Sequence, residues 1–375
     1  ASDDDDDDEF AAGAEASPTA RVDVARRSWS AAAPHVAPCS RACTWGACAA
    51  AFAAAALAAA IFGRRAQLDG ALLYDDKAAV LGSPVVQGEV PLSAVWTRDF
   101  WGKDDVASKE SHKSYRPLVT LSYILNHRLN TRAGLEGNEP YWYHVVSVAL
   151  HAAVSALVVP AVLAAFGWRE RGLLLPCVSA LLFAAHPVHV EAVQNMVGRA
   201  EVMMALFYLL GFLAYAHIAV GGPAAAELPS LAPVRLSSRA LCGIGVTLLC
   251  ALCSMLCKET GVTLPLLCAT WDVLVVVGAE PRLLRAYLLH RRADGGHAWL
   301  WARAPAAAAR YGLLGAGCAL LALWRKGLNG GTPVEFARKQ NMPIWHPHPL
   351  WRAISIVWVW ICLLYTSDAA DDSLR

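Results

Sequence analysis

Long apolar runs separated by polar stretches are the dominant pattern of the chain. A bilayer-crossing helix needs about 20 mostly apolar residues, and eight segments approach this pattern. The predicted spans are residues 43–62, 143–166, 172–187, 201–220, 241–257, 261–279, 308–324 and 350–361. The first is mostly alanine and is either an anchor or a signal segment, but its length and the missing small-residue cleavage pattern favour an anchor. The pattern predicts an all-α polytopic membrane protein.

The composition agrees with this class of protein. Of the 375 residues, 56% are hydrophobic and 17% are charged, whereas about a quarter of the residues of a soluble domain are charged. The net charge of +1 gives no global field that favours nucleic acid or an acidic substrate. Most of the 11 cysteines lie in apolar runs, so a disulfide framework is not expected. Cys253 and Cys257 are one helical turn apart, but no second pair of ligands accompanies them, which favours buried apolar side chains over a metal site.

The two ends of the chain differ in character from its middle. Residues 1–42 include the run "DDDDDDEF" and an alanine-rich stretch, and such low-complexity sequence is expected to be disordered. Residues 362–375 begin with "CLLYTSDAADD", which resembles the translation of a transposon-end sequencing adapter, so we expect this segment to lie outside the fold. The chain, which has no initiator methionine, is expected to be a fragment, with one membrane domain at residues 43–361.

Arginines in the short loops indicate the orientation, because cytoplasmic loops carry an excess of Lys and Arg. Odd-even counting of the spans places these loops on the side of the N-terminus, which is then cytoplasmic. The arginine-bearing loops are residues 167–171, 221–240 and 280–307. The opposite side receives residues 63–142, 188–200, 258–260 and 325–349. The first of these, a loop of about 80 residues, is long enough to translocate whatever its charge.

Two adjacent carboxylates, Asp75 and Asp76 in "YDDKAAV", lie in this long loop. Repulsion between neighbouring carboxylates can raise the pKa of one and leave the other ionised. An ionised aspartate in a partly closed pocket could deprotonate a hydroxyl group or bind a metal. The alternative is a solvated turn after a helix.

The stretch "SHKSYRPLVTLSYILNHRL", residues 111–129, has leucine and isoleucine at helical spacing after its proline. It is too short and too interrupted to span a membrane, so an amphipathic helix at the interface is predicted. Arg116, at the start of this helix, could reach a phosphate or could be an ordinary surface arginine.

The stretch "HPVHVEAVQNMVGRAEV" places His186, His189 and Glu191 close together in the sequence. Their spacing is not that of a metalloprotease helix, and a metal site is not predicted. Arg199 could bind a phosphate with both arms of its guanidinium. A structural pair with Glu201, or an interfacial anchor, is the alternative.

Lys258 and Glu259, in "CKETGVTLP", lie between two apolar runs with almost no loop. Both side chains are therefore forced into the membrane interface. They either extend toward the headgroups or gather with Arg199 around an anionic group.

Five ordered stretches of this chain resemble the transmembrane and tetratricopeptide-repeat (TMTC) proteins. They are "YDDKAAVLGSPVVQGEVPLSAVWTRDFWG", "SHKSYRPLVTLSYILNHRL", "YHVVSVALHAAVSAL", "LLFAAHPVHVEAVQNMVGRAEVMMALFYLL" and "CKETGVTLP", within about residues 70–360. The resemblance implies a multi-pass glycosyltransferase of the endoplasmic reticulum with GT-C architecture and a large first luminal loop. Such enzymes move mannose, with inversion, from dolichyl-phosphate mannose to Ser or Thr of secretory proteins such as cadherins and protocadherins. Neither a metal nor another cofactor is implied.

The resemblance also implies roles for individual residues. Asp75 and Asp76 match the catalytic acidic pair of the first luminal loop, one as general base and the other orienting it. Basic positions are implied at the donor phosphate, and other polar positions support the luminal site. The resemblance assigns Arg199 and Lys258 to the basic set, and His186, His189 and Glu191 to the supporting set. From their positions in the sequence we add Arg116 to the basic set and Glu259 to the supporting set. The chain departs from the family in lacking tetratricopeptide repeats, since no period of about 34 residues is present.

Two other classes of function compete with this interpretation. A transporter or channel would carry charged residues in the middle of its spans and internal symmetry, and we expect neither here. A non-catalytic membrane scaffold would use the spans only as anchors, and would not need a long loop whose acidic and basic groups converge on one face.

Overall fold

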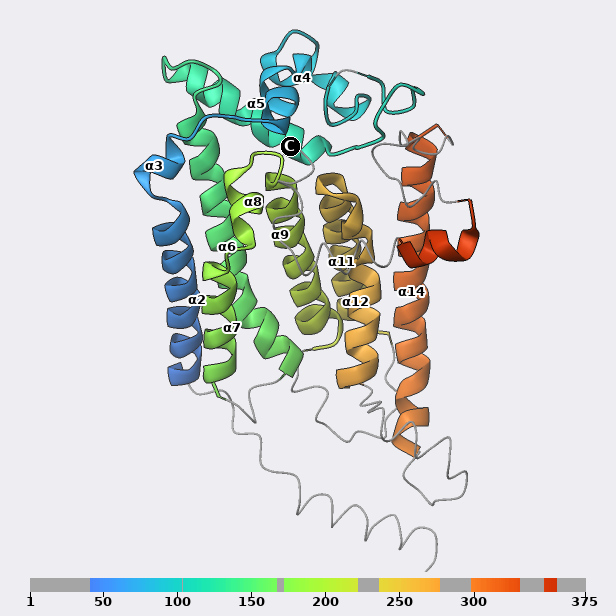
Figure 1. Ribbon diagram of the computed structural model, residues 1–375. Coiled ribbons are helices and arrows are strands. Elements are labelled where there is room, and N and C mark those ends of the chain that lie inside the picture. Colours follow the sequence, from blue (N-terminus) through green and yellow to red (C-terminus); the bar gives the residue numbers. More distant parts are fainter. Residues whose placement is uncertain are drawn as a thin grey trace, which may run out of the picture.

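The computed structural model describes residues 41–102, 104–166, 172–221, 236–276, 298–330 and 347–355. Helices run side by side in a bundle, and the polar loop after the first of them lies over one end (Figure 1). Within these residues the structure contains helices and a single isolated β-bridge between Arg98 and Asp105. The predicted all-α polytopic membrane fold is thus confirmed. Of the disordered segment predicted at 1–42, residues 1–40 lie outside the described residues, whereas residues 41 and 42 belong to a helix. The segment predicted at 362–375 and most of the span predicted at 350–361 also lie outside the described residues.

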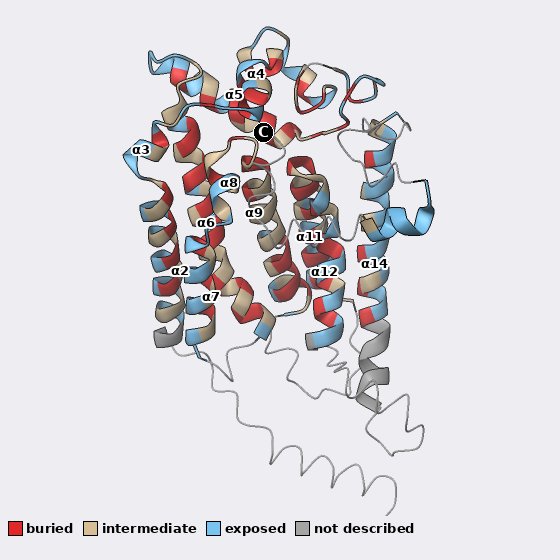
Figure 2. Cartoon of the chain, viewed as in Figure 1, coloured by how far each residue is buried: buried red, intermediate tan, exposed pale blue. Residues whose placement is uncertain are grey.

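Five helices in the described part of the chain are long and apolar enough to cross a membrane. Each of them is formed by a long, mostly apolar run, and the helical conformation allows the backbone groups of such a run to hydrogen-bond within one segment. They are α2 (Arg41–Phe62), α6 (Pro140–Phe166), α9 (Arg199–Ala214, continued by the π-helical η3, Tyr215–Ala219), α11 (Ser238–Cys257) and α14 (Ala298–Leu328). Large apolar side chains on the outer helices are exposed, as expected for a lipid-facing surface, whereas buried residues gather inside (Figure 2).

Two predicted spans form shorter helices. The segment predicted at 172–187 contains α7 (Leu174–Ala185), whose 12 residues cover only about 18 Å at 1.5 Å per residue. The segment predicted at 261–279 contains the 3-10 helix η4 (Glu259–Thr263), then α12 (Leu264–Trp271) and the π-helical η5 (Asp272–Val276). Pro265 occupies the first turn of α12, where proline is favoured, which explains why an α-helix begins there.

The polar loop folds into a cap, which we define as residues 63–139. It contains short elements and one longer helix. They are α3 (Arg65–Leu68), η1 (Lys77–Leu81), α4 (Pro84–Gln87), η2 (Leu92–Trp96) and α5 (Pro117–Arg132). The predicted helix at 117–129 is therefore present as α5. It buries Val119 and Tyr123 but leaves Leu125 and Leu129 exposed.

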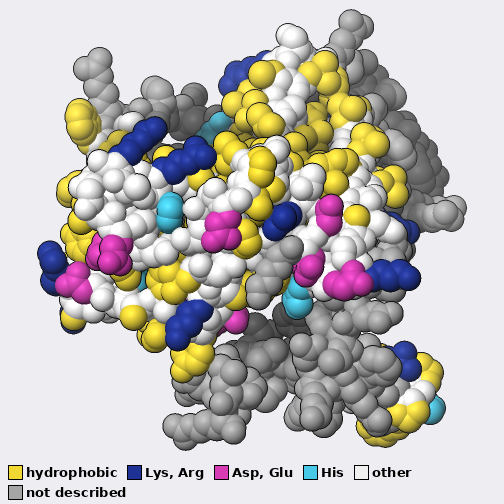
Figure 3. Space-filling model, turned by 90° about the horizontal axis from the view of Figure 1, so that it is seen from above, with side chains coloured by type: hydrophobic (Ala, Val, Ile, Leu, Met, Phe, Trp, Pro, Cys, Tyr) yellow, Lys and Arg dark blue, Asp and Glu magenta, His cyan; other side chains and the backbone are white. Residues whose placement is uncertain are grey.

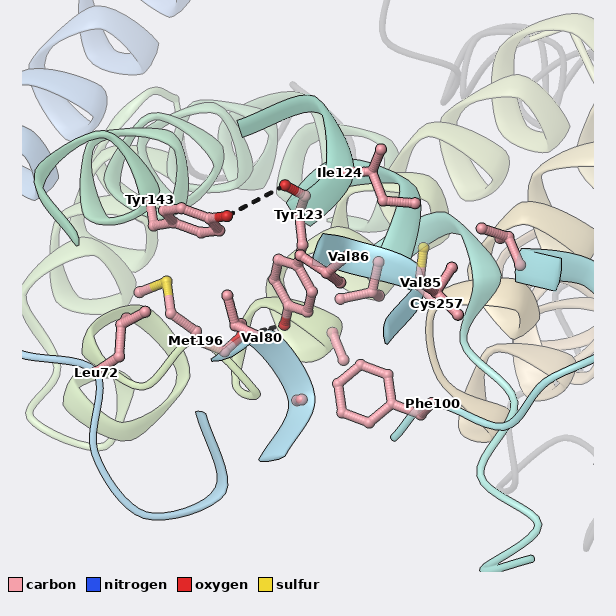
Figure 4. Close-up of a cluster of buried hydrophobic side chains, with 14 residues drawn as sticks. Leu72, Val80, Val85, Val86, Phe100, Tyr123, Ile124, Tyr143, Met196 and Cys257 are labelled. Atoms are coloured by element: carbon pink, nitrogen blue, oxygen red, sulfur yellow. Dashed lines mark hydrogen bonds between the residues drawn. The ribbon is translucent and has the colours of Figure 1, made fainter. Parts of the chain in front are cut away.

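The cap and the bundle share one hydrophobic cluster. Val80, Phe100 and Tyr123 of the cap pack with Met196, in the loop before α9, and with Cys257, at the end of α11 (Figure 4). The Tyr123 hydroxyl donates a hydrogen bond of 2.6 Å to the carbonyl of Met196. This shared core fixes the cap over the ends of α9 and α11.

Lys113 joins the cap to the end of α14. Its buried ammonium donates to the carbonyls of Val106 and Ala107, each at 3.2 Å, and to that of Asn329 at 3.1 Å. In return, the guanidinium of Arg325 donates to the Lys113 carbonyl at 2.7 Å. The end of α14 is therefore held against the cap by hydrogen bonds in both directions.

The expectation that the spans contain no mid-span charge is wrong. Asp272, in the middle of the segment predicted at 261–279, is fully buried. Arg310 of α14 binds both of its carboxylate oxygens, at 2.8 and 3.0 Å, and the Tyr215 hydroxyl donates to it at 2.6 Å. A bidentate partner offsets the cost of placing a carboxylate among apolar helices. Sequence spacing did not reveal the pair because its members are 38 positions apart.

Breaking this pair on one side should destabilise the bundle. Arg310→Gln leaves the Asp272 carboxylate buried without a cation, and we expect the free energy of unfolding to fall by about 3–5 kcal/mol. The measurement is the unfolding temperature in detergent micelles. Replacing Asp272, Arg310 and Tyr215 together by Leu, Met and Phe should recover most of the loss. The control is Thr270→Val, at an exposed position two residues before Asp272. An unfolding temperature of Arg310→Gln equal to that of the control would contradict the expectation.

Candidate active site

The two adjacent aspartates of the cap have different environments. Asp75 is exposed, whereas Asp76 is only 4% exposed. They follow a turn in which the backbone of Tyr74 has φ of +48°, an unusual value for a residue other than glycine. The amide of Asp76 donates to the Leu73 carbonyl at 3.0 Å, which closes the turn. The local backbone therefore separates the aspartates into one outward and one inward side chain.

The loop between α8 (His189–Gln194) and α9 holds Asp76 in place. The backbone amide of Val197 donates to Oδ1 of Asp76 at 3.0 Å. Burial raises the pKa of the Asp76 carboxyl, while hydrogen bonds from the backbone at Val197 and Met196 partly oppose this shift. A fixed carboxylate with a raised pKa is suited to accept a proton.

His144, on α6, was not singled out from the sequence. Its Nε2 lies 2.9 Å from the carbonyl oxygen of Gly70, and its buried Nδ1 has no hydrogen-bond partner in the described ranges. The imidazole is close enough to lower the pKa of Asp76 electrostatically. The available signal was a histidine at the start of an apolar run, in "YHVVSVALHAAVSAL".

Arg199 is fully buried at the start of α9. An arginine has five N–H donors, and each of them has an acceptor here. The acceptors are Ser147 Oγ (3.1 Å from Nε), Ser122 Oγ and Asn126 Oδ1 (3.1 and 2.8 Å from Nη1), and the Tyr143 carbonyl and Met196 Sδ (2.7 and 3.6 Å from Nη2). The Tyr123 ring also lies under the guanidinium, 4.9 Å from Cζ. This geometry favours a structural role for Arg199 and leaves no donor for a phosphate.

A second group of charges, which we call the basic cluster, lies where the cap meets the ends of α11 and α14. It consists of Arg116, Lys258 and Arg325 with the carboxylates of Glu201 and Glu259. Lys258 pairs with Glu201. The carboxylate oxygens of Glu259 lie 3.9 Å from Arg116 Nε and 3.5 Å from Arg325 Nη2. Burial lowers the pKa of Lys258, and the nearby charge of Arg116 lowers it further.

The structure thus brings together some of the residues expected at a phosphate site. Arg116, Lys258 and Glu259 belong to one cluster, whereas Arg199 has its own set of neutral acceptors. Arg325 is an addition that sequence analysis did not single out. The signal for it was a basic residue in the last turn of an apolar helix, on the side predicted to be luminal.

The histidines of "HPVHVEA" lie elsewhere than the basic cluster. His189 packs against Phe183 and His151, with ring centroids 4.3 and 5.0 Å apart, and burial lowers its pKa to about 4. His186 and Glu191 are exposed. Glu191 is near enough to Lys258 to raise the pKa of that ammonium. Within the described ranges, no group of three or more His, Cys, Asp or Glu side chains is arranged to hold a metal ion.

Seen from above the cap, charged side chains of both signs are interspersed with apolar ones (Figure 3).

Comparison with known proteins finds relatives for this part of the chain. It is 36% identical over 217 residues to the human protein O-mannosyl-transferase TMTC4, a match that covers 56% of this chain and 27% of the relative. It is 38% identical over 226 residues to human TMTC1 (59% and 23%), and 34% identical over 244 residues to Drosophila melanogaster Tmtc3 (58% and 23%). The predicted resemblance to the TMTC proteins is thereby confirmed.

The chain spans about a quarter of the length of these curated relatives. No family model matches it, and no solved structure matches it.

Substitution of Arg199 distinguishes a structural from a phosphate-binding role. Arg199→Lys keeps the charge but has only three donors for five acceptors, so we expect a loss of about 3 kcal/mol in the free energy of unfolding. The unfolding temperature in detergent is the measurement. Lys258→Gln is the comparison, because loss of its partly exposed pair with Glu201 should change stability by at most about 1 kcal/mol. A normal unfolding temperature for Arg199→Lys, together with weaker binding of a lipid-linked sugar phosphate, would reassign Arg199 to the phosphate.

Proposed function

We propose that this chain is the membrane part of a protein O-mannosyltransferase of the endoplasmic reticulum. It would take mannose from dolichyl-phosphate mannose and place it on Ser or Thr of secretory proteins such as cadherins. The observation that carries the proposal is a buried, backbone-held carboxylate, Asp76, on the same face of the bundle as the basic cluster. The names of the relatives, which are protein O-mannosyl-transferases, support it.

In the proposed reaction the acceptor hydroxyl oxygen attacks C1 of the mannose. Asp76 accepts the hydroxyl proton, and the bond between C1 and the phosphate oxygen breaks as the new C–O bond forms. The phosphate leaves with one more negative charge than it had in the donor. Arg116 and Lys258 would stabilise that charge, as preorganised cations do in other transfer reactions. A single displacement inverts the anomeric carbon and uses no metal or other cofactor.

Asp76 is a better candidate for the general base than Asp75. The backbone amide of Val197 fixes its carboxylate, and burial raises its pKa toward the range in which a carboxylate is an effective base. Asp75 is exposed, so its position depends on a mobile side chain in water. We assign Asp75 to the entrance side of the site, where it would contact the acceptor or the solvent.

The proposed orientation places the cap in the lumen and the N-terminus in the cytoplasm. The charge bias of the short loops supports it. In this orientation the cap meets secretory proteins, which are the proposed acceptors. The GT-C architecture is proposed on the same basis, since the large first loop and the acidic pair both belong to that plan.

The scaffold and transporter alternatives make different predictions. A scaffold does not require the raised pKa of Asp76 or its fixed position. The buried charges of Asp272 and Arg310 are the feature that a transporter would share, but they are paired with each other and with Tyr215. Mannosyl transfer from dolichyl-phosphate mannose to a cadherin domain separates the enzyme from both alternatives.

Asparagine substitutions test the division of roles between the aspartates. Asp76→Asn removes the proposed base without changing its size, and we expect transfer to fall by about a hundredfold or more. Asp75→Asn is the matched control, with an expected loss of less than about tenfold. The measurement is the initial rate of mannose incorporation into a cadherin domain by the full-length protein. Normal rates for both variants would exclude the proposed mechanism, and a larger loss for Asp75→Asn would exchange the two roles.

The raised pKa of Asp76 also predicts an effect on stability. The folded state retains the Asp76 proton to a higher pH than the unfolded chain does, so stability declines as the pH rises through the interval between the two pKa values. Asp76→Asn cannot ionise and should escape this decline. At neutral pH we expect its unfolding temperature to exceed that of the parent, and at about pH 4 the difference should shrink. An Asp76→Asn protein that is less stable at neutral pH would show that the carboxylate is stabilising.

A further inference from the structure

Arg325 is a buried cation with unused hydrogen-bonding capacity. It is 9% exposed, and its Nε has no hydrogen-bond partner among the residues that the structure describes. Its other groups are well held, since Nη2 donates to the Lys113 carbonyl at 2.7 Å, Nη1 donates to Asn329, and Cζ lies 5.3 Å from the centre of the Tyr115 ring. The guanidinium is therefore fixed in position while one donor remains available.

Arg116 has the same property on the opposite side of the cluster. Its side chain is 16% exposed, and its buried Nε has no hydrogen-bond partner within the described part of the chain. The Phe100 ring supports the guanidinium at 4.9 Å. Two fixed guanidinium groups, one from the cap and one from α14, thus each have an unsatisfied donor.

Glu259 lies between these two cations but is bound loosely. Its oxygens are 3.9 Å from Arg116 and 3.5 Å from Arg325, longer than the 2.7–2.9 Å of a good charge-assisted hydrogen bond. The Tyr115 amide donates to Oε1 at 3.4 Å. The side chain is also 40% exposed, the most accessible part of this group of three. A stronger anion could therefore replace its carboxylate without unpacking the protein.

The charges of the cluster favour such a replacement. Arg116, Lys258 and Arg325 carry three positive charges, and Glu201 and Glu259 carry two negative charges. The carboxylate of Glu201 forms an ion pair with Lys258. If Glu259 turns outward, the two guanidinium groups face an empty position with two unmatched charges, which suits a phosphate monoester dianion.

We propose that Arg116 and Arg325 form a binding site for the phosphate of a polyprenyl phosphate, and that Glu259 occupies this site until the lipid displaces it. Arg325 is thus a further phosphate-binding residue. The proposal rests on the proposed function, because that function supplies the lipid-linked phosphate. It adds that the leaving phosphate, with two charges, binds more tightly than the donor phosphodiester, with one.

Binding without sugar transfer tests this site. The full-length protein in lipid nanodiscs is titrated with a fluorescent short-chain dolichyl phosphate, and the dissociation constant is measured. Arg325→Gln should weaken binding about tenfold or more, because hydrogen bonds to charged groups contribute about 1.5–3 kcal/mol each. Lys326→Gln, an exposed lysine at the next position of the same helix, is the matched control and should bind normally.

Glu259→Gln gives the opposite expectation. Removing the competing carboxylate should tighten binding about threefold to tenfold, and a gain in affinity cannot come from misfolding. Unfolding temperatures of all variants, measured without ligand, show whether Arg325→Gln remains folded. If Glu259→Gln binds more weakly than the parent, or if Arg325→Gln binds as well as Lys326→Gln, the proposal is wrong.

Competitors identify which phosphate the site accepts. Inorganic phosphate should displace the probe only weakly, and phosphatidylserine in the nanodisc should not displace it. Equal displacement by phosphatidylserine would assign the cluster to bulk lipid and overturn the proposal.

Asp76→Asn separates this inference from the proposed function. It should bind the probe normally but not transfer mannose. If the parent protein binds the probe normally but transfers no mannose, the proposed function is wrong and the proposed phosphate site is still supported.

Discussion

The buried guanidinium of Arg199 is the interaction on which the position of the candidate site depends. Its five acceptors come from α5 of the cap, from α6 and from the loop before α9. One cation therefore ties three parts of the chain together at the level where the cap meets the bundle. Val197, two residues before it, holds Asp76. The position of the Asp76 carboxylate therefore depends on the hydrogen-bond network around Arg199. Arg199 itself makes no ion pair among the described residues.

Buried charges are stabilised by three different kinds of environment in this structure. Arg199 is surrounded by neutral oxygens and aromatic rings, Asp272 has a bidentate arginine, and Glu259 makes only long contacts. The first two arrangements are closed and rigid. Among the described residues, only the third leaves guanidinium N–H groups without an acceptor, on Arg116 and Arg325, and it lies at the end of the bundle that the cap covers. This contrast in contact distances is the reason for assigning binding to the basic cluster and structure to the other two sites.

The fold class could be predicted from the sequence because long apolar runs leave few alternatives to membrane helices. Asp75 and Asp76 could be identified as a pair, but their separation into exposed and buried side chains depends on the turn at Tyr74 and on a loop 121 positions away. The role of Arg199 was not predictable, since its acceptors are serine, asparagine and carbonyl groups that carry no charge signal. Arg325 and His144 were missed because each lies in an apolar helix, where a single polar residue has many explanations.

The pair of Asp272 and Arg310 also has a consequence for how the chain enters the membrane. The aspartate is synthesised 38 residues before its arginine. A lone aspartate at the centre of a helix raises the free energy of insertion by about 2.5–3.5 kcal/mol. Until α14 is present Asp272 has no bidentate cation, so we expect the α12–η5 segment to enter the bilayer more readily when α14 accompanies it than when it inserts alone.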